Sequence, residues 1–281
     1  MIIDTHTHFY DPERPEGVPW PNPEDKLLYR RVLPEHYKAL ARPEGVTGTV
    51  VVEASRWVED NQWILDLAAD EPFIVGLVGH LDIGTPQFEQ HIEHYAANSL
   101  FRGIRLGGGA VKQAVRDGDF SDLERLAAKD LELDVLLNAD GLAGVAEIAR
   151  RIPSLRIVIN HVAHVRIDGN APDAVWVEAI KGVAAHENVF MKVSGLVENT
   201  RQTPAPKHLD YYRPTLDTLW DAFGENRLIY GSNWPVSERF ADYAAVQRIV
   251  FAYFNEKGSV AADKYFWKNA KVAYKWVTRE R

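Results

Sequence analysis

Eight short runs of apolar and β-branched residues, separated by longer segments of helical period, constrain the fold of this 281-residue chain most strongly. Most runs are continuously hydrophobic, as in Val50–Val52 and Ile157–Ile159, which is typical of parallel strands covered on both faces. The predicted strands are Ile2–Thr5, Thr47–Glu53, Phe73–Gly79, Phe101–Leu106, Leu133–Asn138, Arg156–His161, Val189–Ser194 and Arg227–Gly231.

The segments between these runs repeat their apolar residues at three and four positions, as helices with one buried face do. Leu216, Leu219 and Phe223 show this spacing, and Gly224 follows them as a helix-ending signal. Eight strand–helix repeats predict an α/β fold, a single (β/α)8 TIM barrel domain over residues 1–281. A doubly wound open sheet is the alternative, but its usual strand count is about five or six and its glycine-rich phosphate loop is missing.

Composition narrows the class of partner. The net charge is −8 and the chain has no basic run, which argues against a nucleic-acid partner and favours a small-molecule substrate. The absence of cysteine excludes disulfides and thiolate ligands, so any metal must be held by His, Asp, Glu or Lys. Residues 1–6 lack a signal-peptide pattern and no segment has the length of a membrane span, so we expect a cytoplasmic protein that does not bind membranes. The oligomeric state is not determined by these features.

Two connections are unusually long, and both would lie on the C-terminal face of a barrel. Residues 9–33 contain five prolines, and residues 198–213 contain Pro204 and Pro206. Long ordered loops on this face usually shape or cover a substrate pocket, which is the interpretation that we favour over flexible surface insertions.

Polar residues cluster where the predicted strands end, which is where a barrel of this kind places its reactive groups. His6 and His8 are two residues apart, so both side chains project to the same face of the first strand, and His161 ends the sixth. Three imidazoles with an open position would suit a catalytic zinc ion, which lowers the pKa of its bound water. The alternative is that the histidines only fill the top layer of the barrel.

Further side chains at the strand ends are candidates for substrate contacts. Arg105 needs an anionic partner, either a substrate carboxylate or, as we favour, an internal salt bridge with Glu53. His80 could orient a carbonyl group or shuttle protons. Lys192 and Ser194 alternate with apolar residues, so we expect both to face the barrel interior and to donate hydrogen bonds. The predicted substrate-binding set is Glu53, Arg105, Asp140, Lys192, Ser194 and Trp234.

Several of these stretches resemble one known family. Asp4–Phe9, His161, Met191–Leu196, Leu228–Val236 and Tyr265–Ala270 together are similar to the amidohydrolase superfamily, in its branch of sugar lactonases of the fuconolactonase type and 2-pyrone-4,6-dicarboxylate lactonase. The resemblance implies a barrel of the metal-dependent-hydrolase type that hydrolyses a lactone. It places His6, His8 and His161 near the scissile carbonyl group and Arg105 near polar groups of the substrate. The resemblance also implies an optional divalent metal ion, with zinc as the first candidate. The ion is optional because some members of the branch work without metal.

The chain departs from the family pattern at the eighth strand, where Asn233 stands in place of the usual aspartate. An amide cannot act as a carboxylate base, because it does not titrate near neutral pH. If the chain hydrolyses its substrate, another group must accept the proton, and the candidates are Glu53, Asp140, Asp82 and His80. The substitution also weakens the case for tightly bound zinc.

The leading hypothesis is therefore a lactonase-like hydrolase of a polar or carboxylated, sugar-acid-type cyclic ester. Its catalytic candidates are His6, His8, His80, Arg105, His161 and Asn233, and its metal candidates are His6, His8 and His161. A non-oxidative decarboxylase is a second hypothesis, although such enzymes keep the aspartate and a strand-five histidine where Asn233 and Asn138 stand here. A non-catalytic protein that binds a small ligand is the third, and Asn233 motivates it.

Overall fold

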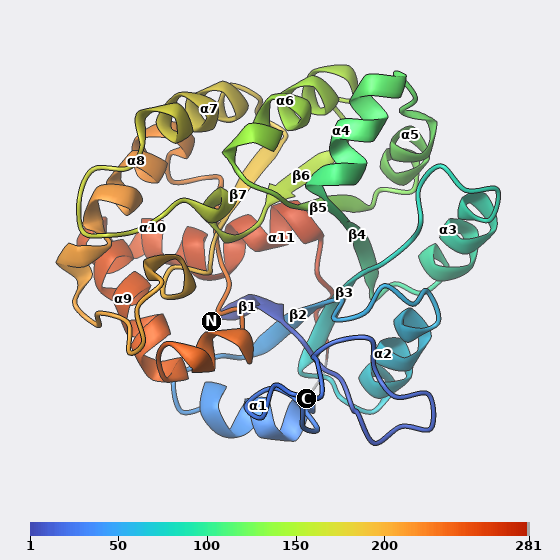
Figure 1. The fold of residues 1–281 in the computed structure, drawn as a ribbon, viewed down its shortest axis with the longest axis horizontal. Helices are drawn as coiled ribbons and strands as arrows, with labels where there is room; N and C mark the ends of the chain where they lie inside the picture. Colours follow the sequence, from blue (N-terminus) through green and yellow to red (C-terminus); the bar gives the residue numbers. More distant parts are fainter. Residues whose placement is uncertain (280–281) are drawn as a thin grey trace.

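A computed structural model describes residues 1–279 and places eight parallel strands in sequential order around a barrel (Figure 1). Each strand pairs in parallel with the next along the chain. The strands are β1 (Ile3–Thr7), β2 (Gly48–Val52), β3 (Ile74–Gly79), β4 (Phe101–Gly107), β5 (Glu132–Leu136), β6 (Arg156–Ile159), β7 (Val189–Val193) and β8 (Leu228–Tyr230).

The seam between the first and last strands is short but well bonded. Thr7 and Trp234 form a parallel bridge, and the His8 amide donates to the Trp234 carbonyl oxygen at 3.0 Å. The Ser232 amide donates to the Asp4 carboxylate at 2.8 Å. These contacts bring the polar residues after β1 beside those after β8, and they confirm the predicted barrel.

Helices form a ring around the strands (Figure 1). They bury apolar faces against the sheet, as Leu216, Leu219 and Phe223 do in α8. The helices are α1 (Pro34–Ala41), α2 (Asp60–Ala69), α3 (Phe88–Ala96), α4 (Gly108–Asp117), α5 (Ser121–Ala128), α6 (Leu142–Arg151), α7 (Ala174–Ala184), α8 (Arg213–Phe223), α9 (Tyr243–Glu256), α10 (Ser259–Asp263) and α11 (Asn269–Tyr274). No helix in the described part of the chain is long and apolar enough to cross a membrane.

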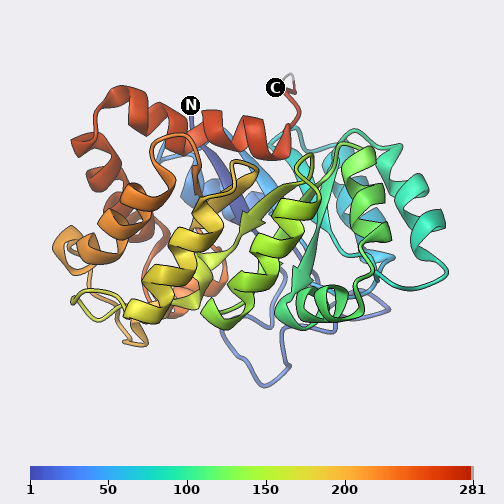
Figure 2. The ribbon, with the colours of Figure 1, turned by 90° about the horizontal axis from the view of Figure 1, so that it is seen from above.

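The two ends of the barrel are covered differently. Figure 2 shows α11 lying across one end, while the loop after β1 projects from the other. Ala270, Ala273 and Tyr274 of α11 pack into the apolar interior with residues such as Val50 and Val158. The end with α11 is thus closed by apolar packing, and the carboxyl ends of the strands remain for chemistry.

The predicted strands are confirmed in number and order, with small differences at their ends. The sixth strand stops at Ile159, and His161 begins a short turn, η2 (His161–His164). All four residues of this turn have positive φ angles near +50°. This conformation costs about 1–2 kcal/mol per non-glycine residue, and such strain is concentrated at functional sites.

Candidate active site

A cavity of about 820 Å³ opens at the carboxyl ends of the strands. That volume is in the range of small-molecule sites. Residues within or just after each of the eight strands contribute to its wall, and Pro19 and Trp20 of the long loop after β1 complete it. They include His8, Trp20, Glu53, His80, Arg105, His161, Glu198 and Asn233. The structure thus assembles one site from segments far apart in the sequence.

Three predicted histidines meet at this cavity. The His6 ring lies 5.0 Å from the His8 ring and 4.3 Å from the His161 ring, between centroids. His8 and His161 are in the cavity wall, and His6 packs against both of them. The His8 Nδ1 atom bonds to the Val52 carbonyl oxygen at 2.9 Å, which fixes the ring on β2.

Burial keeps all three imidazoles neutral. It lowers the pKa of His8 to about 3, with a further contribution from the charge of Arg105. Burial lowers the pKa values of His6 and His161 well below 6.5, and the nearby charges of Lys192 and His164, respectively, act in the same direction. Neutral histidines offer one donor and one acceptor each, so their hydrogen-bond partners decide what they can do.

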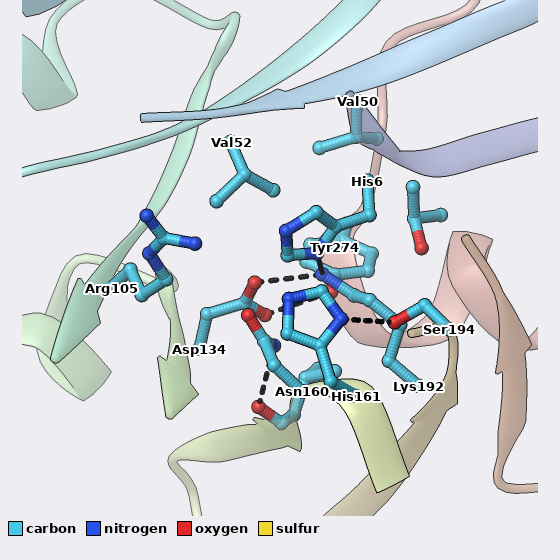
Figure 3. Close-up of polar contacts among 12 residues, drawn as sticks. His6, Val50, Val52, Arg105, Asp134, Asn160, His161, Lys192, Ser194 and Tyr274 are labelled. Carbon is cyan, nitrogen blue, oxygen red and sulfur yellow. Dashed lines mark hydrogen bonds and ion pairs between the residues drawn. The ribbon is translucent and has the colours of Figure 1, made fainter. Parts of the chain in front are cut away.

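A buried chain of polar groups lies behind His6, as Figure 3 shows. The Lys192 ammonium group donates to Asp134 at 2.7 Å and to His6 Nδ1 at 3.2 Å. The hydroxyl of Tyr274 in α11 donates to the second oxygen of Asp134 at 2.8 Å. Because an ammonium group can only donate, His6 Nδ1 accepts and the proton of the neutral ring resides on Nε2. This Nε2–H group is buried and has no partner among the described residues.

Arg105 has the internal partner that the sequence favoured. Its Nε atom donates to Glu53 Oε1 at 2.8 Å, and Nη2 donates to the Glu53 carbonyl oxygen at 2.9 Å. Both side chains are 13% exposed, and both residues line the cavity. The pair holds the guanidinium plane in one orientation at the cavity wall.

The other predicted residues differ in their position relative to the cavity. His80 is in the cavity wall and bonds to Asp82 at 3.0 Å. Ser194 is buried and bonds to His161 Nδ1 at 2.9 Å, so it supports a histidine. Trp234 is fully buried and donates to Glu238. Asp140 is 68% exposed and pairs with Lys112 of α4, so the structure does not bring it to the cavity.

Lys192 also lies away from the cavity wall. It has no exposed surface, and its ammonium group is taken up by Asp134 and His6. The expectation that it faces the barrel interior is confirmed. Its two hydrogen bonds go to side chains behind the cavity wall, so in this arrangement they support the site.

Two cavity residues were missed by the sequence reasoning. His164 reaches the cavity because the left-handed turn η2 places it there, 5.4 Å between ring centroids from His161. Glu198 begins the short turn η3 (Glu198–Thr200) after β7 and accepts a hydrogen bond from Asn233 Nδ2 at 2.8 Å. The only sequence signal for Glu198 is an acidic residue soon after a strand end.

Gly195 is required where β7 leads into this turn. It has a φ angle of +65°, and a Cβ atom there would lie 2.9 Å from the Cβ atom of His161. Any larger residue would both strain the backbone and push His161. The glycine therefore lets η3 approach the histidine cluster closely.

The three histidines do not form a metal-binding set as they are arranged. Among residues 1–279, no group of three His, Asp or Glu side chains has the arrangement of a metal site. Lys192 fixes the His6 proton on Nε2, so that atom has no free lone pair. Asn233 provides an amide where a carboxylate would balance the charge of the metal. The zinc site on His6, His8 and His161 stays a prediction.

Comparison with known proteins gives consistent matches over nearly the whole chain. The sequence profile of the amidohydrolase family matches residues 3–276. The L-fucono-1,5-lactonase of Burkholderia ambifaria is 35% identical over 255 residues, which cover 86% of this chain and 84% of that protein.

Solved structures agree with these matches. An amidohydrolase from Burkholderia multivorans has been solved with bound HEPES and with bound zinc. These structures match with TM-scores of 0.88 and 0.85, at 26% and 27% identity. Each comparison covers 98% of this chain and 99% of the other. The relative therefore holds zinc in one crystal form.

Proposed function

Because the chain belongs to the amidohydrolase family, we propose that it is a hydrolase that opens a polar, sugar-acid-type lactone by attack of water. The observation that supports this most directly is the meeting of neutral His6, His8 and His161 at a cavity on the carboxyl ends of the strands. The identity shared with a fuconolactonase supports the lactone as the class of substrate.

The chemistry that we propose depends on preorganised donors. As water attacks the lactone carbonyl carbon, the carbonyl oxygen gains negative charge, and fixed N–H groups stabilise that charge. We assign this task to Arg105, which lines the cavity and whose guanidinium is oriented by Glu53. His8 and His161 shape the wall against which the carbonyl group lies.

Replacing His161 with alanine is expected to reduce kcat/KM on the best lactone by about 10²-fold, because the wall that positions the carbonyl group loses a ring and a misplacement of about 1 Å alone can cost that much. The assay follows proton release from a panel of five- and six-membered sugar-acid lactones. His94→Ala in α3 is the matched control, because His94 is exposed and lies outside the cavity, and it should keep the wild-type rate. A His161→Ala enzyme as fast as the control would contradict the proposed site. Ligand binding without turnover by the wild type would favour a non-catalytic protein.

Removal of metal is expected to leave lactone hydrolysis unchanged. We expect this because Lys192 donates to His6 Nδ1 and the described residues assemble no group of three ligands, so the proposed mechanism assigns the stabilisation of charge to protein groups. The measurement is the rate before and after dialysis against a chelator, together with metal analysis of both samples. Loss of activity that zinc restores would show instead that the histidines rearrange to bind a metal.

A further inference from the structure

The cavity wall carries three carboxylates, and Glu198 is the one that contacts neither a cation nor a histidine, because Asp82 contacts His80. Glu53 pairs with Arg105, whereas Glu198 contacts an uncharged amide. Its Oε1 atom accepts from Asn233 Nδ2 at 2.8 Å. Its Oε2 atom is buried and has no hydrogen-bond partner among the described residues. A buried acceptor without a partner is costly, so this oxygen is suited to a molecule that enters the cavity.

The backbone that carries Glu198 is anchored on both sides. Asn199 donates through Nδ2 to the His161 carbonyl oxygen at 3.2 Å and accepts from the Ile167 amide at 3.0 Å. The Thr200 hydroxyl donates to the Val197 carbonyl oxygen at 2.7 Å. The turn η3 is therefore bonded to the turn that positions His161, and Glu198 lines the same cavity as His161.

Asn233 is held in an equally defined position. Its φ angle is +60°, a left-handed conformation that asparagine tolerates better than most residues. Its backbone carbonyl oxygen accepts a hydrogen bond from the Ser237 amide at 3.1 Å. Its side chain also interacts with His8, so Asn233 links His8 with Glu198. The amide cannot take up a proton, but it orients the carboxylate that can.

We propose that Glu198 accepts the proton of the attacking water and that Asn233 is its positioning residue; the proposal rests on the lactonase function above. Water forms the new C–O bond while its proton passes to Glu198 Oε2. When the tetrahedral intermediate collapses, the bond to the ring oxygen breaks and its electron pair stays on that oxygen. Glu198 returns the proton to the ring oxygen. The product is a hydroxy acid, and Glu198 is again a carboxylate.

The acidity of Glu198 suits this task. Burial raises its pKa to about 7, and the hydrogen bond from Asn233 opposes this only in part. A base works best when its pKa is near the working pH. The titratable and charged groups near it are Tyr212 before α8 and, in the same cavity wall, His8, Glu53, Arg56, His80, Asp82, Arg105, His161 and His164. Burial lowers the pKa values of His8, His161 and His164, so these three rings do not compete for the proton near neutral pH.

Replacing Glu198 with glutamine is expected to reduce kcat by about 10²–10⁴, with a much smaller change in KM, because glutamine keeps the acceptor for Asn233 and cannot take up a proton. In the wild type, kcat/KM should fall tenfold per pH unit below about pH 7, and Glu198→Gln should lose this acid limb. Glu198→Asp should recover part of the rate. The control is Asp168→Asn, which changes an exposed carboxylate outside the cavity and should leave rate and pH profile unchanged.

The outcomes separate the two proposals. If the wild type hydrolyses a lactone and Glu198→Gln is equally fast, or keeps the acid limb of the pH profile, the role of Glu198 is overturned. The lactonase function then still stands. Absence of wild-type turnover on the whole lactone panel would overturn the function and this role together. Thermal unfolding of each variant, compared with wild type, shows whether a lost rate reflects lost folding.

Discussion

Replacing Lys192 with methionine is expected to lower the free energy of unfolding by about 3–5 kcal/mol, the cost of leaving one charge of a buried pair without its partner. Lys192 and Asp134 have no exposed side-chain surface, and they meet at 2.7 Å. Methionine fills similar space but leaves the Asp134 carboxylate with the Tyr274 hydroxyl alone. Urea unfolding of both proteins measures the difference.

The control for this experiment is a lysine whose ion pair is in water. Lys207 pairs with Asp242 at the same distance, but the two side chains are 56% and 60% exposed. Lys207→Met should therefore cost no more than about 1 kcal/mol. If Lys192→Met cost as little, the expected penalty for an unpaired buried charge would be wrong. The double variant Lys192→Met with Asp134→Leu should be more stable than Lys192→Met, because it removes the unpaired charge.

The stability advantage of Glu198→Gln over the wild type is expected to grow by about 2–3 kcal/mol between about pH 5 and about pH 8. Burial raises the pKa of Glu198 from 4.5 to about 7 in the folded protein. Between these two values the folded state binds more protons than the unfolded state, so the contribution of Glu198 to stability falls as the pH rises. Glutamine does not titrate, so the variant does not lose stability in this way as the pH rises.

Urea unfolding of wild type and variant across this pH range gives the difference directly, and the other titrating groups cancel in it. Asp168→Asn serves as the control again, and its difference from wild type should be nearly independent of pH. A flat difference for Glu198→Gln would mean that the carboxyl group titrates as it does in the unfolded chain. The acid limb in kcat/KM would then require another group.

The sequence predicted the barrel well because parallel strands and their covering helices have distinct periods. Continuous runs such as Val50–Val52 are buried on both faces, and burial on both faces appears in the sequence as an unbroken run of apolar residues. The positions of His8 and Arg105 at the cavity followed from the same periodicity, because each lies near the carboxyl end of a strand. Residues placed by a regular element could thus be assigned to the cavity before the structure was known.

Residues placed by irregular turns could not be assigned in this way. Glu198 and His164 reach the cavity through backbone conformations that the periodicity of the sequence does not predict, including the positive φ angles of η2. Asp140 fails to reach it for the same reason, since a helical turn after β5 directs its side chain to Lys112. The sequence therefore did not identify the base that we propose, although it showed that Asn233 replaces the usual aspartate.

The polar chain behind His6 makes the site dependent on an element that follows every strand in the sequence. Tyr274 of α11 bonds to Asp134, which is 140 positions away in the sequence, and Lys192 bonds to His6, which is 186 positions away. Contacts of such separation form late in folding, because the entropy of closing the chain is lost before they stabilise anything. During synthesis, the strands that carry the histidines are complete long before α11 exists. The cavity should gain its final geometry only after the last helix has docked at the opposite end of the barrel.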